Sequence, residues 1–351
     1  TQLLTGSDGK LDAPYLEQIV HQIAQLHQCG VEVTVVSSGA IAAGWAELGL
    51  PKRPTDVSEL QAVAAVGQRL LMTFMHDAFA AHQIHVGQLL LTRSDFDDRT
   101  RFLNIRNCVS RLHRYGGVPI INENDTVAVD ELRFGDNDLL AALICNAIRA
   151  DALVLLTVVA GILDQHTQKV ELIDHLQDYE SLVRDEMTAL GTGGIRSKLE
   201  AAKLVTGAGE VAVIANGREP DVLQRLFAST EPIGTVFAPA ARKLDSRKRW
   251  IGLTKRPSGT LTIDSGAVTP LCRRGKSLLA IGITGLSGQF ERGAVVLVCE
   301  QDGSHVARGL SNYSVDELRL LMGKRSNHFE KILGRAAYAE VVHRDNLVMI
   351  G

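Results

Sequence analysis

The feature that most constrains this chain is a repeated alternation, up to about residue 240, of short β-branched apolar runs with longer helical patterns. Such alternation is typical of a mostly parallel sheet covered by helices. We therefore predict an α/β domain with an open sheet over residues 1–240. The strands expected in it are 31–36, 86–91, 118–121, 152–156 and 211–214, and the helices are 15–28, 59–81, 139–148 and 199–205.

The pattern of apolar runs and glycines changes after Asp245. Glycine-punctuated apolar runs at 259–263, 278–283 and 294–299 predict a small, mainly β domain over residues 246–345, with 238–249 as the linker. Up to Asp245 the chain carries 21 basic and 31 acidic residues, and after it 16 basic against 9 acidic. Either the two domains have different electrostatic roles or their charges have drifted by chance, and the sequence leaves both open.

The overall composition excludes several classes of protein. With 45% hydrophobic and 22% charged residues, and 32 Gly against 9 Pro, the chain is neither disordered nor fibrous. No run approaches the roughly 20 apolar residues of a membrane span, so we expect no membrane partner. The five cysteines are scattered, which indicates a reducing cytoplasm and no disulfide framework, and no residues have the spacing of a metal site.

The glycine-rich segment G-T-G-G-I-R-S-K spans residues 191–198 and precedes a helical pattern. Glycines let backbone N–H groups approach phosphate oxygens, a helix N-terminus adds positive dipole, and a lysine adds a mobile charge. The spacing is not that of a Walker loop, and a flexible connector is the alternative. The candidate nucleotide-binding residues are Thr192, Gly193, Gly194, Ile195, Arg196, Ser197 and Lys198.

Amides and carboxylates gather in two further segments, N-E-N-D at 122–125 and G-D-N-D at 135–138. The first follows a predicted strand, at the sheet edge where open α/β folds bind ligands. This mixture suits a small ligand that carries an ammonium group and carboxylates. One of Asp136, Asn137 and Asp138 is expected to cap the following helix. Asp138 is our candidate for the carboxylate that holds a catalytic lysine.

The segment Ser38-Gly39 follows the predicted strand 31–36. Ser38 is a poor candidate for a nucleophile because the G-x-S-x-G pattern is absent and no histidine is placed to serve it. We expect its hydroxyl and the nearby backbone N–H groups, including that of Gly39, to bind substrate.

Together these motifs resemble the glutamate 5-kinase family of the amino acid kinase fold, over nearly the whole chain. The tail from about Lys248 to Val342 resembles the PUA module, which is best known from RNA-modifying enzymes. The segments that carry the resemblance are V-V-S-S-G-A-I-A-A-G (35–44), H-V-G-Q-L-L-L-T-R-S-D (85–95), R-F-L-N (101–104), V-P-I-I-N-E-N-D (118–125), F-G-D-N-D (134–138), G-T-G-G-I-R-S-K (191–198), R-K-R-W-I (247–251) and G-R-A-A-Y-A-E-V-V-H-R-D (334–345).

The resemblance implies phosphorylation of the side-chain carboxylate of L-glutamate by ATP with Mg²⁺, the first step of proline synthesis. It also implies feedback inhibition by proline, a homo-oligomer (dimer or tetramer) and a weak RNA contact through the basic tail. Residues that match the family's glutamate site are Ser38, Asp125 and Asn137, with Asn122 and Gly39 beside them. Thr157, Val158 and residues 192–198 match its nucleotide site, and Lys198 with Asp138 its catalytic pair.

Two features depart from the family pattern. Val158 stands where T-D-x-x-G-L-Y has an acidic residue, and the loop up to Val170 is short. The family's first strand, with its K-x-G phosphate contact, is expected before Thr1. An N-acetylglutamate or carbamate kinase is the rival within the fold, and an RNA-binding protein with a kinase-like scaffold is the rival outside it. The tail lacks a dense basic stripe with interleaved aromatics.

Overall fold

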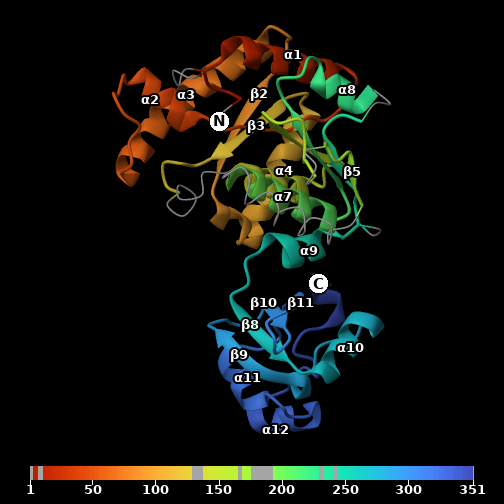
Figure 1. The fold of residues 1–351 in the computed structure, drawn as a ribbon. Coiled ribbons are helices and arrows are strands. Elements are labelled where there is room, and N and C mark those ends of the chain that lie inside the picture. The colour runs from red at the N-terminus through yellow and green to blue at the C-terminus, as the bar shows by residue number, and fades with distance from the viewer. Residues whose placement is uncertain are drawn as a thin grey trace. The chain divides into compact units, whose positions relative to one another are not determined.

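The computed structural model describes residues 3–6, 11–128, 137–164, 168–174, 193–228, 232–240 and 243–350. The chain forms two compact units, Thr1–Lys243 and Leu244–Gly351. Figure 1 shows helices and strands in both units, with the helices of the first unit on either side of its strands. Among the described residues, no helix has the length and apolar character needed to cross a membrane.

The strands of the first unit form two sheets. The three-stranded sheet has the order β1 (Val35–Val36), β3 (Val118–Glu123), β2 (Val86–Leu91), and both pairs are parallel. The four-stranded sheet has the order β4 (Ala152–Thr157), β6 (Val211–Asn216), β7 (Thr235–Phe237), β5 (Leu172–Ile173), with only the β6–β7 pair antiparallel. The predicted mostly parallel α/β fold is confirmed, but the strands lie in two sheets and not in one.

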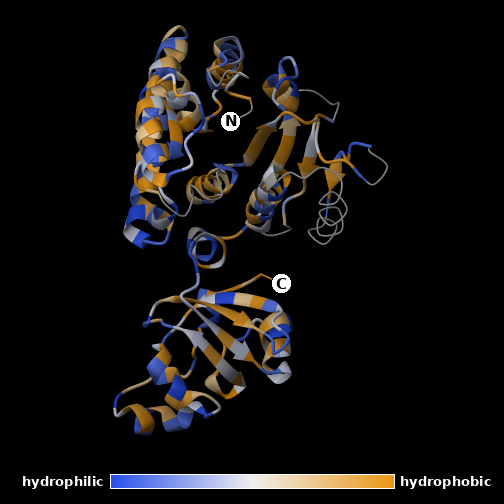
Figure 2. Cartoon of the chain, turned by 60° about the vertical axis from the view of Figure 1, so that its left-hand side comes forward, coloured by the Kyte–Doolittle hydropathy of each residue, from blue (hydrophilic) through white to orange (hydrophobic). Residues whose placement is uncertain are grey.

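Helices cover both faces of these sheets, as the alternation along β6 shows. Val213 and Ala215 pack into one apolar cluster, and Ala212 and Ile214 pack into another. The first cluster contains residues of α1 (Ala13–Gln28), α3 (Val57–Ala80) and α8 (Val222–Ala228), and the second contains residues of α5 (Asn137–Ile148) and α7 (Gly193–Gly207). Figure 2 shows the strands as apolar segments between these helices. The other helices among the described residues of this unit are α2 (Ala40–Glu47), the 3₁₀ turn η1 (Arg93–Phe96) and α4 (Arg99–Arg114).

The predicted strand 31–36 is wrong in length. Only Val35 and Val36 form a ladder, opposite Ile120 and Ile121 of β3. The four residues 31–34 line a cavity, and in the described structure no strand lies beside them to pair with. Apolar periodicity reports burial, but a strand also needs a partner.

The second unit contains a five-stranded sheet in which β8 and β10 are parallel and the other pairs are antiparallel. Its order is β12 (Leu347–Met349), β11 (His305–Leu310), β10 (Val295–Cys299), β8 (Gly259–Ile263), β9 (Ile283–Gly288). Its helices and helical turns are α9 (Ser246–Arg249), η3 (Trp250–Thr254), α10 (Ser265–Arg274), η4 (Ala280–Gly282), α11 (Val315–Leu321), η5 (Ser326–His328), α12 (Phe329–Leu333) and η6 (Arg344–Asn346). The predicted small, mainly β domain is confirmed.

Two details of this region differ from prediction. The expected strand 278–283 is a bridge from Leu278 to Val342 followed by the 3₁₀ turn η4, because the chain turns there before β9 begins. The expected linker 238–249 contains the short helix α9, whose last residue, Arg249, is fully buried. Arg249 donates from Nε to the carbonyl of Leu244 at 2.7 Å, which satisfies part of a buried charge.

Candidate active site

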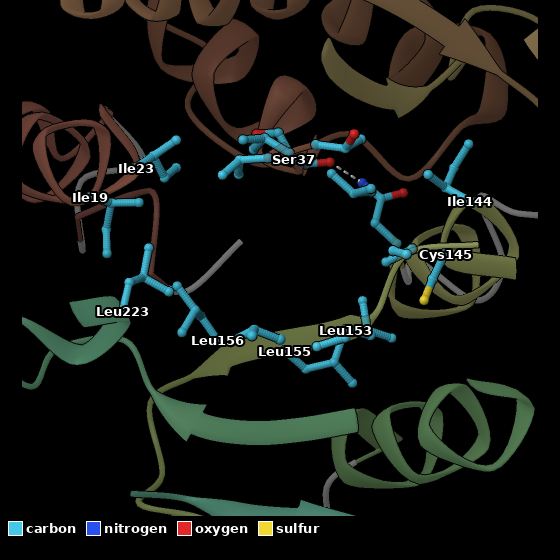
Figure 3. A pocket seen from close by; sticks show the side chains of 18 of the residues that line it. Ile19, Ile23, Ser37, Ile144, Cys145, Leu153, Leu155, Leu156 and Leu223 are labelled. Atoms are coloured by element: carbon cyan, nitrogen blue, oxygen red, sulfur yellow. Dashed lines mark hydrogen bonds between the residues drawn. The ribbon is translucent and has the colours of Figure 1, made fainter. Parts of the chain in front are cut away.

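A cavity of about 1420 Å³ lies within the first unit, between the ends of β1 and the strand β4. Figure 3 shows Ile19 and Ile23 of α1 on one side, Ile144 and Cys145 of α5 on the other, and Leu155 of β4 below. These walls are apolar. The polar residues that line the cavity include Ser37, Ser38, Asn137, Asp138, Thr157 and Lys198, from four separate segments of the sequence.

Lys198 and Asp138 form an ion pair in this cavity. Lys198 Nζ lies 2.8 Å from Asp138 Oδ2, and the side chains are only 16% and 14% exposed. Ser197 donates its hydroxyl to the same carboxylate oxygen at 2.9 Å. Because charge interactions strengthen away from bulk water, the carboxylate fixes the position of the ammonium group. A positioned cation of this kind can act on a ligand oxygen that becomes more negative.

Lys198 belongs to the first turns of α7, whose start also lines the cavity. Gly194 and Ile195 are lining residues, and the first N–H groups of a helix have no partner within it. The N-terminus of this helix therefore suits an anion such as phosphate. Arg196 points elsewhere, since it pairs with Glu200 at 3.3 Å and is 65% exposed. Thr192 lies outside the described residues.

Asn137 stands at the start of α5 and contacts β3 through Asn122. Its Nδ2 donates to the carbonyl of Ser37 and, at 2.8 Å, to Oδ1 of Asn122. The expected helix cap is neither Asn137 nor Asp138, because both are already in the first turn of α5. Asp136 lies outside the described residues. The side chains of Asn137 and Asp138 are thus available to the site.

The turn from β1 to α2 presents Ser38 to the cavity. Gly39 is the residue before α2 and has a φ of +95°, a conformation that residues with a side chain rarely adopt. Glycine here allows the sharp turn that places Ser38 and the first N–H groups of α2 together.

Asp125 follows the end of β3 and is not among the described residues that line the cavity. Burial raises the pKa of its carboxyl to about 6.

Comparisons with known proteins identify the family of the chain. The model of the amino acid kinase family matches residues 1–216, and that of the PUA domain matches residues 259–333. A glutamate 5-kinase of Syntrophus aciditrophicus (strain SB) is 44% identical over 355 residues, covering 99% of this chain and 92% of the relative. One of Geobacter sulfurreducens is 43% identical, covering 99% and 95%. The chain belongs to the glutamate 5-kinase family.

The resemblance found in the sequence is therefore confirmed. A solved structure similar to this glutamate 5-kinase family member is a carbamate kinase from Giardia lamblia bound to AMP-PNP. It is 20% identical, with a TM-score of 0.46, and covers 65% of this chain and 90% of that one.

At the end of β4, the position that departs from the glutamate 5-kinase pattern lines the cavity. Thr157 and Val158 are both lining residues, and Val158 is 45% exposed. The side chain of Val158 has no polar atom, so at the cavity rim it offers apolar contact and no hydrogen bond. A ligand group bound against this side chain is therefore held there by van der Waals contact.

Sequence reasoning missed Gln68, whose side chain supports the candidate site. Gln68 of α3 accepts a hydrogen bond at 2.7 Å from Nδ2 of Asn122, which is 54 positions away. No motif marks it. The available signal is a polar residue beside Gly67, in a helix whose neighbouring positions face the core. Sequence reasoning also missed four polar residues of α4 that line the cavity, namely Arg106, Asn107, Ser110 and His113.

Proposed function

We propose that this chain transfers the γ-phosphoryl group of ATP to the side-chain carboxylate of L-glutamate. The product is L-glutamyl 5-phosphate, and the reaction is the first step of proline synthesis. The observation that carries this proposal is the Lys198–Asp138 ion pair inside a cavity that Ser38 and Asn137 also line. Membership of the glutamate 5-kinase family supports the same reaction.

The chemistry needs no covalent enzyme intermediate and no general base. A carboxylate oxygen of glutamate is already ionised, so it attacks the γ-phosphorus directly, in line with the leaving oxygen of ADP. One P–O bond forms and one breaks, and the electron pair of the broken bond stays on ADP. Lys198 stabilises the negative charge that spreads over the transferring group, while Asp138 holds its ammonium in place.

The nucleotide is proposed to bind at the start of α7. Gly194 and Ile195 line the cavity there, and the backbone N–H groups at the start of a helix suit phosphate oxygens. Thr157 and Val158 form the rim at which the adenine side is held, with apolar contact replacing an acidic one. Mg²⁺, bound with the ATP phosphates, supplies further neutralisation of their charge.

Glutamate is proposed to bind between the turn at Ser38 and the start of α5. The hydroxyl of Ser38 and the N–H groups after it suit a carboxylate, and the acceptor on Asn137 suits the ammonium group. Asp125 is not among the residues that line the cavity, and we propose that its carboxylate attracts the same ammonium group from the end of β3. Asn122 supports Asn137 through its Oδ1. A free ammonium group is what distinguishes glutamate from N-acetylglutamate, and the site offers acceptors for it.

The release of ADP with different acceptors tests this assignment. The protein is incubated with ATP and, separately, L-glutamate, N-acetyl-L-glutamate or carbamate. We expect ADP release to depend on L-glutamate alone. Preferential turnover of N-acetylglutamate or carbamate would assign the chain to the rival kinases.

Proline is proposed as a feedback inhibitor that overlaps the glutamate site. Proline carries the same α-carboxylate and a cationic nitrogen, so the groups that bind glutamate also suit proline. The apparent KM for glutamate should therefore rise with proline concentration while kcat stays constant. Inhibition that glutamate does not relieve, or the absence of inhibition, would contradict the overlap.

A weak RNA contact is proposed for the second unit. The hydrogen bond from Gly323 N to Ala280 O joins the segment after α11 to η4, which follows α10 in the sequence. Five exposed cations at the end of α10 and in the segments after α10 and α11 have no ion-pair partner among the described residues. They are Arg273, Arg274, Lys276, Lys324 and Arg325. Filter binding of structured RNA at two salt concentrations tests the contact, because phosphate binding weakens steeply with salt. Binding that does not change with salt, or no binding, would contradict it.

A homo-oligomer and a cytoplasmic location complete the proposal. In the described structure β2 forms the outer edge of its sheet, and residues of β2 and α3 line a cavity of about 680 Å³. A second copy is proposed to dock at this exposed edge strand. Light scattering during gel filtration gives the oligomeric state. Cys29, Cys108 and Cys272 are exposed free thiols, which suits a reducing compartment.

A further inference from the structure

We infer that Gln68 is a positioning residue of the glutamate site. Acting through Asn122, it determines which atom of the Asn137 amide faces the substrate. The inference rests on the proposed function, because it takes the cavity at Asn137 as the glutamate site. Gln68 itself is not proposed to touch the substrate.

Three side-chain amides form a directed chain of hydrogen bonds. Asn122 donates from Nδ2 to Oε1 of Gln68 at 2.7 Å. Oδ1 of Asn122 accepts from Nδ2 of Asn137 at 2.8 Å and from the backbone N–H of Glu123 at 2.9 Å. Nδ2 of Asn137 also donates to the carbonyl of Ser37. The chain runs from α3 through β3 to the start of α5, and every link points the same way.

The orientation of each amide fixes the next one. A side-chain amide accepts at its oxygen and donates at its nitrogen. If Asn122 were rotated by a half-turn, its NH₂ group would face the N–H of Glu123 and the NH₂ of Asn137, donor against donor. Gln68 opposes that rotation by accepting the outward NH₂ of Asn122. Because Asn122 is only 2% exposed, water does not readily replace this acceptor.

The consequence for Asn137 is chemical. Both hydrogens of its NH₂ group are engaged, one by Ser37 and one by Asn122. The cavity therefore meets the amide as an acceptor, through Oδ1. An acceptor binds the substrate's ammonium group and repels a carboxylate. The chain of amides thus favours a phosphoryl-accepting substrate that has a free α-amine.

Gln68 also carries an unfavourable feature that packing does not explain. In the described structure its Nε2 is buried and has no hydrogen-bond partner, which costs free energy. A half-turn of Gln68 would place this donor against Nδ2 of Asn122, so it would break the chain of amides. A residue selected for stability alone would avoid that cost, whereas a residue needed for its oxygen must accept it.

Paired substitutions at this position separate the acceptor from the packing. Gln68→Met keeps the length of the side chain and removes the acceptor, while Gln68→Glu keeps an acceptor. Gln61→Met, seven residues earlier on α3, is the matched control, since the structure gives Gln61 no side-chain hydrogen bond among the described residues. Each variant is assayed for kcat, KM for glutamate, KM for ATP and inhibition by glutarate, which has both carboxylates but no ammonium group.

We expect Gln68→Met to raise KM for glutamate about tenfold, roughly the loss of one hydrogen bond to a charged group, and to leave KM for ATP and the inhibition constant of glutarate unchanged. Gln68→Glu should restore most of the affinity for glutamate, and Gln61→Met should behave as the parent chain. Melting temperatures identify any variant that fails to fold, in which case Gln68→Leu takes the place of Gln68→Met.

The possible failures are distinguishable. If the parent chain does not phosphorylate glutamate, the proposed function fails. If Asn137→Ala raises KM for glutamate but Gln68→Met does not, the site holds and the role of Gln68 is overturned. If neither variant changes KM, the site itself is misplaced. Equal weakening of glutamate and glutarate by Gln68→Met would show a general packing role and would overturn the inference.

Discussion

At the scale of single residues, the proposed mechanism gives Lys198 the central chemical role. Its ammonium is held at 2.8 Å from Asp138 in a sheltered cavity, so it is already in place before charge develops in the transferring group. We predict that Lys198→Ala lowers kcat by about 100-fold or more, the size expected for one electrostatic group, with a much smaller change in KM for glutamate.

Steady-state kinetics check this prediction, with Lys203→Ala as the control because Lys203 is an exposed lysine of the same helix. The control should keep both constants near those of the parent chain. If Lys198→Ala changed only KM, the lysine would contribute binding and not catalysis.

Asp125 provides a pH dependence. Burial raises the pKa of its carboxyl from 3.8 to about 6, and only the ionised form attracts the substrate's ammonium group. We predict that KM for glutamate is constant above about pH 7 and rises about tenfold per unit below about pH 6. Asp125→Asn should show a high KM with little dependence on pH in this range. A KM for the parent chain that is flat from pH 5 to 8 would remove Asp125 from the site.

The same pKa shift also affects the stability of the fold, but here a higher pH is unfavourable, whereas a higher pH favours the binding of glutamate. Since the folded pKa lies above the unfolded one, the folded chain binds more protons between about pH 4 and 6, and its stability falls as pH rises through that window. Asp125→Asn should lose this contribution and be more stable than the parent at pH 7, by up to about 3 kcal/mol. Urea unfolding at pH 4.5 and pH 7 tests it, and a variant that is less stable at pH 7 would contradict burial as the cause.

At the scale of elements, the crossing of α2 and α3 positions two parts of the proposed glutamate site, the turn at Ser38 and the side chain of Gln68. A Cβ at Gly67 would lie 1.8 Å from the carbonyl oxygen of Ala40, and one at Gly44 would lie 1.9 Å from that of Val63. The two helices therefore approach at a distance that only glycine permits. Gln68 follows Gly67 directly, and Ala40 follows the turn that presents Ser38.

We predict that Gly67→Ala destabilises the first unit by about 3 kcal/mol or more, because a backbone atom must move to admit the methyl group. KM for glutamate should rise in the same variant, since the amide chain begins at the next residue. Ala62→Ser, on the exposed side of α3, should change neither. Urea unfolding gives the comparison, and a Gly67→Ala variant as stable as the parent would mean that the helices are further apart.

Sequence patterns predicted elements well where local periodicity and burial agree. The strand 86–91 and the helix over 15–28 follow this rule. The pattern failed at 31–34, where the residues line the cavity and form no β-ladder. It also failed at 278–283, where the buried residues form an isolated bridge and a 3₁₀ turn. Pairing is a long-range property, so apolar alternation cannot supply it.

At the scale of the whole molecule, only those residues of the candidate site that stand in recognisable motifs could be predicted from the sequence. The ion pair of Lys198 and Asp138 was expected because both residues stand in motifs with chemical meaning. Gln68 was not, because its role depends on a contact 54 positions away in sequence. The exposed position of Arg196 was not predicted either, since a glycine-rich segment does not say which of its side chains face the ligand.

The two compact units have separate apolar cores, which leads to a prediction about truncation. All the candidate catalytic residues precede Leu244, and the core of the second unit is built from that unit alone. A chain ending at Asp245 should fold and keep kcat within about threefold of the full chain, as expected of a domain with its own core. A folded truncation without activity would show that the second unit contributes to the site.

The central claim is that phosphoryl transfer occurs to the side-chain carboxylate of free glutamate. Hydroxylamine converts an acyl phosphate to a stable hydroxamate, so trapping the product tests the claim most directly. The account predicts γ-glutamyl hydroxamate when L-glutamate and ATP are both present, none when either is omitted, and almost none with Lys198→Ala. Release of ADP with glutamate but without hydroxamate, or hydroxamate formed equally well from N-acetylglutamate, would contradict it.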